Sequence, residues 1–490
     1  MRLQKGIVFL ILLAAVYEGG LGLLQLLGME PSGNRLYPFT GTFYNPGPFA
    51  CYLALSLPWA LYTICNEKLA ISNLGKSSTI SNSGRSELNK LQLLITNYKL
   101  LIVRVLITNY ALIEALIVVG LDAVLLPASM SRTAWCAAVV GGIVALLGNK
   151  VILFGSRLKD VCTKNSLLPH RPSLLTLHSS LLIIIIAAAM VYGVYRMKQG
   201  SADGRFLMWK VAAGAVNPHP FDGVGWRNVA GAYGEAQERY FASGMASPDE
   251  ILVADAPGYV FNEYLQIAIA YGWGWSLLMI AVLIMAFVSA FRSGRYGIAG
   301  SVAACAVVMT ASYPFQFPIS ILTIGAICIA AFIGSGKVSE RKFNIQTSTF
   351  KIIIVLAATI FLTIDCKKFD QNLPFQTGLA LHKSGQWEKS NEVMMDLLPH
   401  SSDPMPLNII GKNYGELGKR DSAEYYLRHS TLRCPNRLYP HYLLMKLYMK
   451  EPADSSAARR EAKILLTKKE KVPSPAVEQM RKEAGFLIDE

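Results

Sequence analysis

The chain is poor in charged residues, since Asp, Glu, Lys and Arg make up only 16% of its 490 positions. Its eight cysteines contain no CxxC pair, and no metal-ligand spacing is present. These absences give no indication of a zinc-binding domain of the usual spacing, and the cysteines are expected to be packing residues; no cofactor is expected. Apolar residues are abundant instead, at 52% of the chain with a positive mean hydropathy, which is typical of a polytopic membrane protein.

Apolar runs that are long enough, or nearly long enough, to cross a hydrocarbon core of about 30 Å recur along most of the chain. They predict about nine membrane-spanning helices within residues 1–365. The first run is expected to be retained, because no small-residue cleavage site follows it. The runs are 6–27, 49–65, 111–127, 133–147, 174–195, 265–291, 298–312, 319–332 and 352–364.

The distribution of Lys and Arg predicts the orientation, because short basic loops resist translocation. Residues 66–110 carry six basic and two acidic residues, and residues 150–171 carry five and one. Both segments, and the N-terminus, are therefore expected in the cytoplasm. The polar segment 198–263 carries five basic and eight acidic residues and is expected on the outer side. The formal net charge of +14 then follows from topology and predicts no nucleic-acid partner.

The segment 369–490 differs in composition, being charged and helical in period, and predicts a second domain on the outer side. Small and apolar residues recur there at an interval close to the 34 residues of a tetratricopeptide repeat. The fold class expected is therefore all-α: a transmembrane bundle followed by an α-solenoid of about three tetratricopeptide-like repeats, able to hold a protein partner. An unrelated bundle of helical hairpins is the alternative. The recurring residues are Gly378, Gly385 and Met394, followed by Gly411, Gly418 and Leu427.

Five strings occur in order with apolar runs between them. They are GTFYNPGPFACYLALSLP at 41–58, SRTAW at 131–135, SADGRFLMW at 201–209, GVGW at 223–226 and FNEYLQ at 261–266. Together they resemble the O-antigen ligase family, whose relatives include O-antigen polymerases and protein O-oligosaccharyltransferases. The first apolar run resembles a middle helix of the family, so several spans that usually precede it are expected to be missing.

The resemblance implies a metal-independent glycosyltransferase of the bacterial inner membrane. Such an enzyme transfers a glycan from undecaprenyl diphosphate to an acceptor at the periplasmic face, most commonly O-antigen to the lipid A core. Polymerisation of O-antigen and transfer to protein remain alternatives, and so does a catalytically silent membrane scaffold that uses its repeats for complex assembly. A transporter is disfavoured: Glu18 and Asp122 lie in apolar runs, but no inverted repeat pairs the two halves.

A diphosphate leaving group gains negative charge as the glycosidic bond breaks, and a guanidinium fork stabilises that charge with parallel N–H donors. Arg205 is the first candidate for this role; the alternative is an arginine that reaches toward lipid phosphates. Arg132 lies at the outer end of an apolar run, where a cation has little topological reason to be. It is the second candidate.

Family members commonly carry a histidine directly before the Asn of the last motif, and this chain has Phe261 there. The acceptor hydroxyl still needs a proton acceptor within hydrogen-bond reach. Glu263 is the first choice, and His219 and Asp222 are reserves. The alternative for all three is an ordinary solvated or turn residue.

Further candidates for substrate binding share a polar or aromatic side chain, or a flexible backbone, in the same segment. Glycines allow backbone to approach a sugar or phosphate, aromatic rings stack on sugar faces, and amides orient polar groups. Tight turns and interfacial anchors explain these residue types equally well. The candidates are Ser201, Trp209, His219, Gly223, Gly225 and Asn262.

Overall fold

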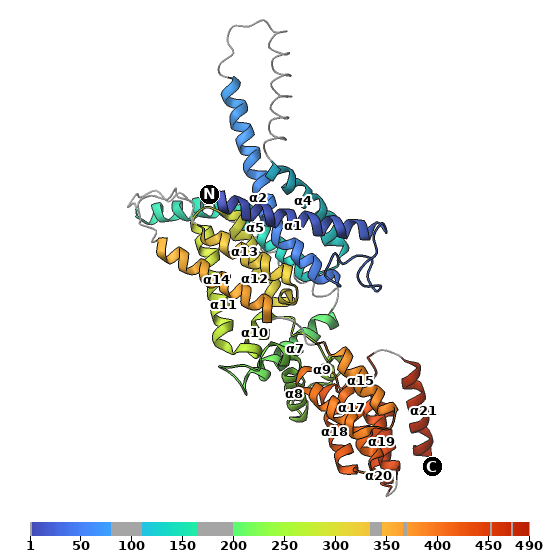
Figure 1. Cartoon of the computed structure of the whole chain (residues 1–490). Coiled ribbons are helices and arrows are strands. Elements are labelled where there is room, and N and C mark those ends of the chain that lie inside the picture. Colours follow the sequence, from blue (N-terminus) through green and yellow to red (C-terminus); the bar gives the residue numbers. More distant parts are fainter. Residues whose placement is uncertain are drawn as a thin grey trace. The chain divides into compact units, whose positions relative to one another are not determined.

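In a computed structural model, residues 2–79, 110–163, 199–333, 345–365, 370–450, 453–471 and 474–489 are described. Every regular element in these ranges is a helix, as expected for an all-α protein (Figure 1). The chain divides into two compact units. The first unit comprises Met1–His178 and Leu278–Asp365, and the second comprises Ser179–Leu277 and Cys366–Glu490. The polar segment between the apolar runs thus belongs to the same unit as the C-terminal helices.

The first unit consists of apolar helices. Four stretches are long and apolar enough to cross a membrane: Gly6–Leu26, Pro46–Asn66, Ala111–Ala128 and Trp273–Arg292, the last of which begins in the second unit. Four shorter stretches are also apolar: Arg132–Gly148, Tyr296–Ala311, Pro318–Phe332 and Lys351–Ile364. The helices that contain them are α1 (Arg2–Leu26), α2 (Pro46–Thr79), α4 (Tyr110–Ala128), α5 (Arg132–Thr163), α11 (Trp273–Arg292), α12 (Tyr296–Ala311), α13 (Pro318–Phe332) and α14 (Ile345–Asp365).

One predicted span has the wrong start. The run 265–291 is interrupted at Gly272, which separates α10 (Glu263–Tyr271) from α11. Gly272 has φ 88°, and an added Cβ would lie 2.4 Å from the carbonyl oxygen of Phe221, so only glycine fits. The run 174–195 and much of both basic segments lie outside the described residues. The count of nine spans therefore stays a prediction.

Small residues bring two helices of the first unit into close contact. An added Cβ at Gly141 on α5 would lie 2.8 Å from the carbonyl oxygen of Gly300 on α12, and one at Gly300 would lie 2.4 Å from that of Gly141. Close approach at small residues is a usual way for helices to associate in lipid, where no hydrophobic force drives them together.

Two of the acids in the apolar runs, Glu18 and Asp122, are directed into protein. Glu18 on α1 is 1% exposed, and its carboxylate accepts bonds from the backbone N–H and the hydroxyl of Thr42. It therefore holds the connection between α1 and α2. Asp122 on α4 is 2% exposed, and neither carboxylate oxygen has a hydrogen-bond partner among the described residues.

The polar segment of the second unit is largely helical. It forms α7 (Gln199–Val216), the short η1 (Trp226–Asn228), α8 (Val229–Ala242), α9 (Pro248–Val253) and α10. Lys210 on α7 joins the first three α-helices, because its ammonium group donates to the Tyr240 hydroxyl on α8 at 2.6 Å and to Glu250 on α9 at 2.9 Å. These bonds, with the Ser247 and Glu250 capping box, hold the pKa of Glu250 near 2 against the opposing effect of burial.

The rest of the second unit contains three helical hairpins and a last helix, α21 (Pro475–Asp489) (Figure 1). Within the first two hairpins a glycine on one helix admits a large side chain from the other: Gly378 faces Met394, and Gly411 faces Leu427. These four residues are among those that recur in the sequence. That the hairpins are tetratricopeptide repeats stays a prediction. The hairpins are α15 (Asn372–Lys383) with α16 (Trp387–Leu397), α17 (Met405–Glu416) with α18 (Arg420–Arg433), and α19 (Tyr439–Met449) with α20 (Ser455–Thr467).

Two glycines of α17 provide a matched test of this packing. An added Cβ at Gly411 would lie 2.6 Å from Leu427 Cγ, whereas one at Gly415 would meet Leu447 at an ordinary 3.6 Å. We expect Gly411→Ala to destabilise the second unit by about 1–3 kcal/mol through overpacking. Gly415→Ala should be neutral or stabilising by up to about 1 kcal/mol through helix propensity. Thermal unfolding of the full chain in detergent measures both, and equal effects would contradict the packing.

Candidate functional site

Arg205 lies on α7, half-buried, with its guanidinium carbon 5.5 Å from the ring centroid of Phe261. A cation over an aromatic face is attracted by the ring quadrupole, so Phe261 helps to place the guanidinium. Phe261 has φ 52°, an uncommon conformation for a bulky residue. It stands directly before Asn262, whose side chain caps α10 by accepting the backbone N–H of Leu265 at 3.1 Å.

A cavity of about 510 Å³ opens beside Arg205 within the second unit. Its wall carries two cations and one acid, together with apolar and aromatic surface. This mixture suits a ligand with both an anionic group and an apolar part. The lining residues are Gly204, Arg205, Leu207, Met208, Tyr233, Val253, Asp255, Ala256, Pro257, Phe261 and Lys471.

Glu263, the predicted proton acceptor, begins α10 and is 1% exposed. Glu263 does not line the cavity. It follows Phe261 by two residues, and Phe261 does line the cavity. Two residues of extended chain span at most about 7 Å, so the backbone of Glu263 stays close to the ring that contacts Arg205. Burial raises the pKa of the neighbouring Tyr259, and the charge of Glu263 raises it further.

The reserve acceptors lie in an exposed turn. His219 Nδ1 is 3.7 Å from the Asp222 carboxylate, and the two side chains are 51% and 77% exposed. Gly223, with φ 67°, has α10 directly against it: an added Cβ would lie 2.3 Å from the carbonyl of Ala270. The backbone N–H of Gly225 donates to that same carbonyl at 2.9 Å. Both glycines thus pack the turn onto α10, and contact with a sugar stays a prediction for each.

The remaining predicted residues are spread over both units. Trp209 packs edge to face on Phe206 at 5.7 Å within α7, and Trp226 is buried and stacks on Tyr271 at 6.3 Å. Ser201 lies on α7, but its side chain is outside what the structure describes. Arg132 is the first residue of α5 and belongs to the first unit. Its predicted contact with the substrate therefore stays a prediction.

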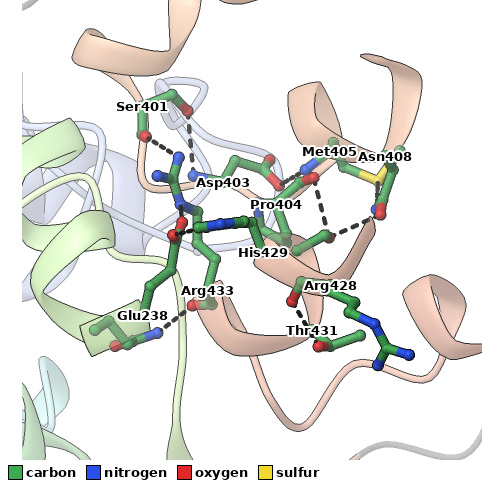
Figure 2. A network of polar contacts seen from close by, with 12 residues as sticks. Glu238, Ser401, Asp403, Pro404, Met405, Asn408, Arg428, His429, Thr431 and Arg433 are labelled. Atoms are coloured by element: carbon green, nitrogen blue, oxygen red, sulfur yellow. Dashed lines mark hydrogen bonds and ion pairs between the residues drawn. The ribbon is translucent and has the colours of Figure 1, made fainter. Parts of the chain in front are cut away.

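A buried ion pair joins α8 to α18 within the second unit. Arg433 Nε donates to Glu238 at 2.5 Å, and His429 Nδ1 lies 2.6 Å from the other oxygen of the same carboxylate (Figure 2). The Arg433 side chain is 4% exposed, and its guanidinium also donates to the carbonyl of Ser401. The neighbouring Gln237 donates to the main-chain carbonyl of Arg433 at 2.5 Å. Two adjacent residues of α8 therefore hold one residue of the second hairpin.

Two glycines allow α8 to approach these contacts. An added Cβ at Gly231 would lie 2.1 Å from the carbonyl oxygen of Pro399, and one at Gly234 would lie 3.1 Å from Arg433 Nε. Gly231, Gly234 and Glu238 are spaced by three and four residues, so they share one face of the helix. This spacing of two glycines and an acid on one helix face is the pattern in the sequence that could have indicated the contact.

Sequence reasoning also missed two charged residues of the cavity, Asp255 and Lys471. They lie 216 positions apart in the chain, yet Lys471 Nζ is 3.0 Å from Asp255 Oδ2. Asp255 follows α9 in a polar stretch, and Lys471 ends a run of charged residues after α20. Both look like ordinary solvated residues in the sequence, and only the folded contact distinguishes them.

Comparison with protein families supplies the identification. A family model described as O-antigen ligase matches residues 117–280, which include Arg132, Arg205 and Glu263. Residues 117–280 thus resemble the O-antigen ligase family. This family consists of membrane enzymes of the glycosyltransferase kind, ligases and polymerases, and the apolar helices of this chain agree with a membrane location. No curated protein and no solved structure matches the chain.

Removal of the Glu238 charge tests the buried contact. In Glu238→Gln the Arg433 guanidinium stays buried without its carboxylate, which costs about 3–5 kcal/mol for pairs of this kind. We expect the melting temperature of the second unit, followed by fluorescence in detergent, to fall by roughly 10 °C. The matched control is Glu416→Gln, because Glu416 pairs with Lys450 at 2.8 Å on the surface, with 46% and 54% exposure. It should cost about 0–1 kcal/mol; equal losses would disprove the special weight of the buried pair.

Proposed function

We propose that this O-antigen ligase family member transfers a glycan from undecaprenyl diphosphate to an acceptor at the periplasmic face of the bacterial inner membrane. The acceptor we favour is the lipid A core. The observation that carries the proposal is the position of Arg205, half-buried in the wall of a cavity of about 510 Å³ and placed against an aromatic ring. The family match over the same segment supports it.

In the proposed reaction an acceptor hydroxyl attacks the anomeric carbon of the glycan. The bond from that carbon to the diphosphate oxygen breaks, the hydroxyl proton passes to a protein carboxylate, and undecaprenyl diphosphate leaves with both electrons of the broken bond. Arg205 stabilises the charge that grows on the leaving oxygen, and a donor fixed in place before reaction does so without a reorganisation cost. Arg132 is proposed as a second contact to the diphosphate or the glycan. The residues proposed to bind substrate are Ser201, Trp209, His219, Gly223, Gly225 and Asn262.

Arg205→Ala tests the contact with the leaving group. Loss of a preorganised donor costs about 2–4 kcal/mol in the barrier, so glycan transfer should fall by roughly 30-fold to 1000-fold. Arg205→Lys should recover only part of the activity, because an ammonium lacks the planar fork. Arg239→Ala is the control, since Arg239 is exposed on α8 and does not line the cavity.

The readout is the surface polysaccharide of a deletion strain that expresses each variant. Bare lipid core with full-length glycan on its carrier indicates a ligase, and single repeat units on the core indicate a polymerase. An unchanged glycan profile in Arg205→Ala would refute the leaving-group contact and favour the membrane scaffold. The repeat-like hairpins and the Phe261 substitution are the features that keep this scaffold as the alternative.

The proton acceptor is tested by a second pair of variants. We propose Glu263, which is buried beside Phe261, rather than Asp255, which lines the cavity and already accepts the Ala256 N–H and Lys471. Glu263→Gln should lower kcat by about 10²-fold to 10⁴-fold, the usual contribution of a general base. Asp255→Asn should leave kcat within about threefold of the wild type, because no proton transfer is lost. The reverse ranking of the two variants would assign the role to Asp255.

A further inference from the structure

The C-terminal helices contribute a cation to the cavity of the ligase segment. Lys471 lies after α20 and lines the cavity together with Arg205 of α7. Apart from Lys471, every lining residue lies between Gly204 and Phe261. The site therefore includes one residue from outside the segment that matches the ligase family, which is 117–280.

Residues 252–257 contribute to the cavity lining and are held by side chains from the C-terminal part of the chain and from α8. Asn436 Nδ2 donates to the carbonyls of Leu252 and Ala254, at 3.2 and 2.5 Å, and the Ser402 hydroxyl donates to that of Pro257 at 2.8 Å. Gln237 Nε2 bonds the carbonyl of Asp255 at 3.0 Å. Four carbonyls of residues 252–257 are thus hydrogen-bonded. These bonds fix the backbone of Asp255, whose side chain contacts Lys471.

Lys471 is available to a stronger anion than its present partner. Its side chain is 42% exposed and that of Asp255 is 56% exposed, and a pair so open to water contributes little to stability. A diphosphate carries more charge than one carboxylate and presents several oxygens to an ammonium group. Exchange of Asp255 for a phosphate oxygen therefore gives up little and gains a charge-assisted bond.

The geometry points to a diphosphate site with two cations, in which Arg205 holds one phosphate and Lys471 holds the other. Asp255 is the anion that the phosphate replaces at Lys471. This inference rests on the proposed function for the identity of the donor. It adds that the C-terminal helices complete the donor site, so that they take part in substrate binding besides any protein partner they hold.

The test is equilibrium binding of ³²P-labelled undecaprenyl diphosphate to the full chain in phosphatidylcholine nanodiscs, which supply no competing anionic lipid. Lys471→Ala should raise the Kd about tenfold, the size of one lost bond to a charged group, and Lys471→Arg should restore most of it. Lys469→Ala removes an exposed cation two residues away and should leave the Kd unchanged. Asp255→Asn should leave the Kd equal to or lower than that of the wild type, since it removes the competing anion.

Undecaprenyl monophosphate is the second probe. It has no second phosphate for Lys471, so Lys471→Ala should change its Kd by less than about threefold. The melting temperature of Lys471→Ala should stay within about 2 °C of the wild type, because an exposed pair is lost. A preserved fold excludes a general structural cause of weaker binding.

The outcomes separate this inference from the proposed function. Binding that depends on Lys471, in a protein that transfers no glycan, would support the site and refute the ligase reaction. Equal binding by Lys471→Ala and Lys469→Ala would overturn the site while transfer by the wild type still supports the reaction. An equal loss for the monophosphate and the diphosphate would also overturn it, and so would a wild-type protein that binds neither lipid.

Discussion

The buried contact between Glu238 and Arg433 is the constraint on which the second unit depends. A carboxylate and a guanidinium removed from water are costly unless each is fully paired, and here His429, Ser401 and Gln237 complete the bonding. A shift of α8 along the second hairpin would separate Glu238 from Arg433 and His429. Since α8 leads into α9 and the wall of the cavity, a local ion pair determines where the ligase segment meets the C-terminal helices.

The second unit thus combines the polar segment of the ligase-like region with the C-terminal helices. The segment from α7 to α10 brings Arg205 and Phe261 together. The C-terminal part brings polar side chains that bind the backbone of residues 252–257. Both parts hold this segment in place, because Gln237 of α8 binds one of its carbonyls and Asn436 and Ser402 bind three others. The C-terminal part of the chain therefore acts on the geometry of the cavity.

Sequence reasoning reached the parts of this structure that depend on local pattern. Apolar runs predicted the helices of the first unit, and the recurrence of Gly378 and Gly411 anticipated glycines that each admit a large side chain. It failed at Gly272, because a glycine inside an apolar run is read as helix unless the backbone packed against it is known. It also failed at Lys471, because the partner Asp255 is 216 positions away and no local pattern encodes such a contact.

Phe261 shows how the departure from the family pattern fits the site. A bulky residue at φ 52° costs on the order of 1 kcal/mol or more, and such a cost persists only where the surroundings compensate for it. The compensation here includes the Asn262 cap of α10 and the contact of the Phe261 ring with Arg205. A histidine in this position would offer the guanidinium a second cation when protonated, whereas a phenyl ring offers only its negative face. Phe261 therefore places the arginine more firmly, and in the proposed reaction the proton acceptor has to be a carboxylate.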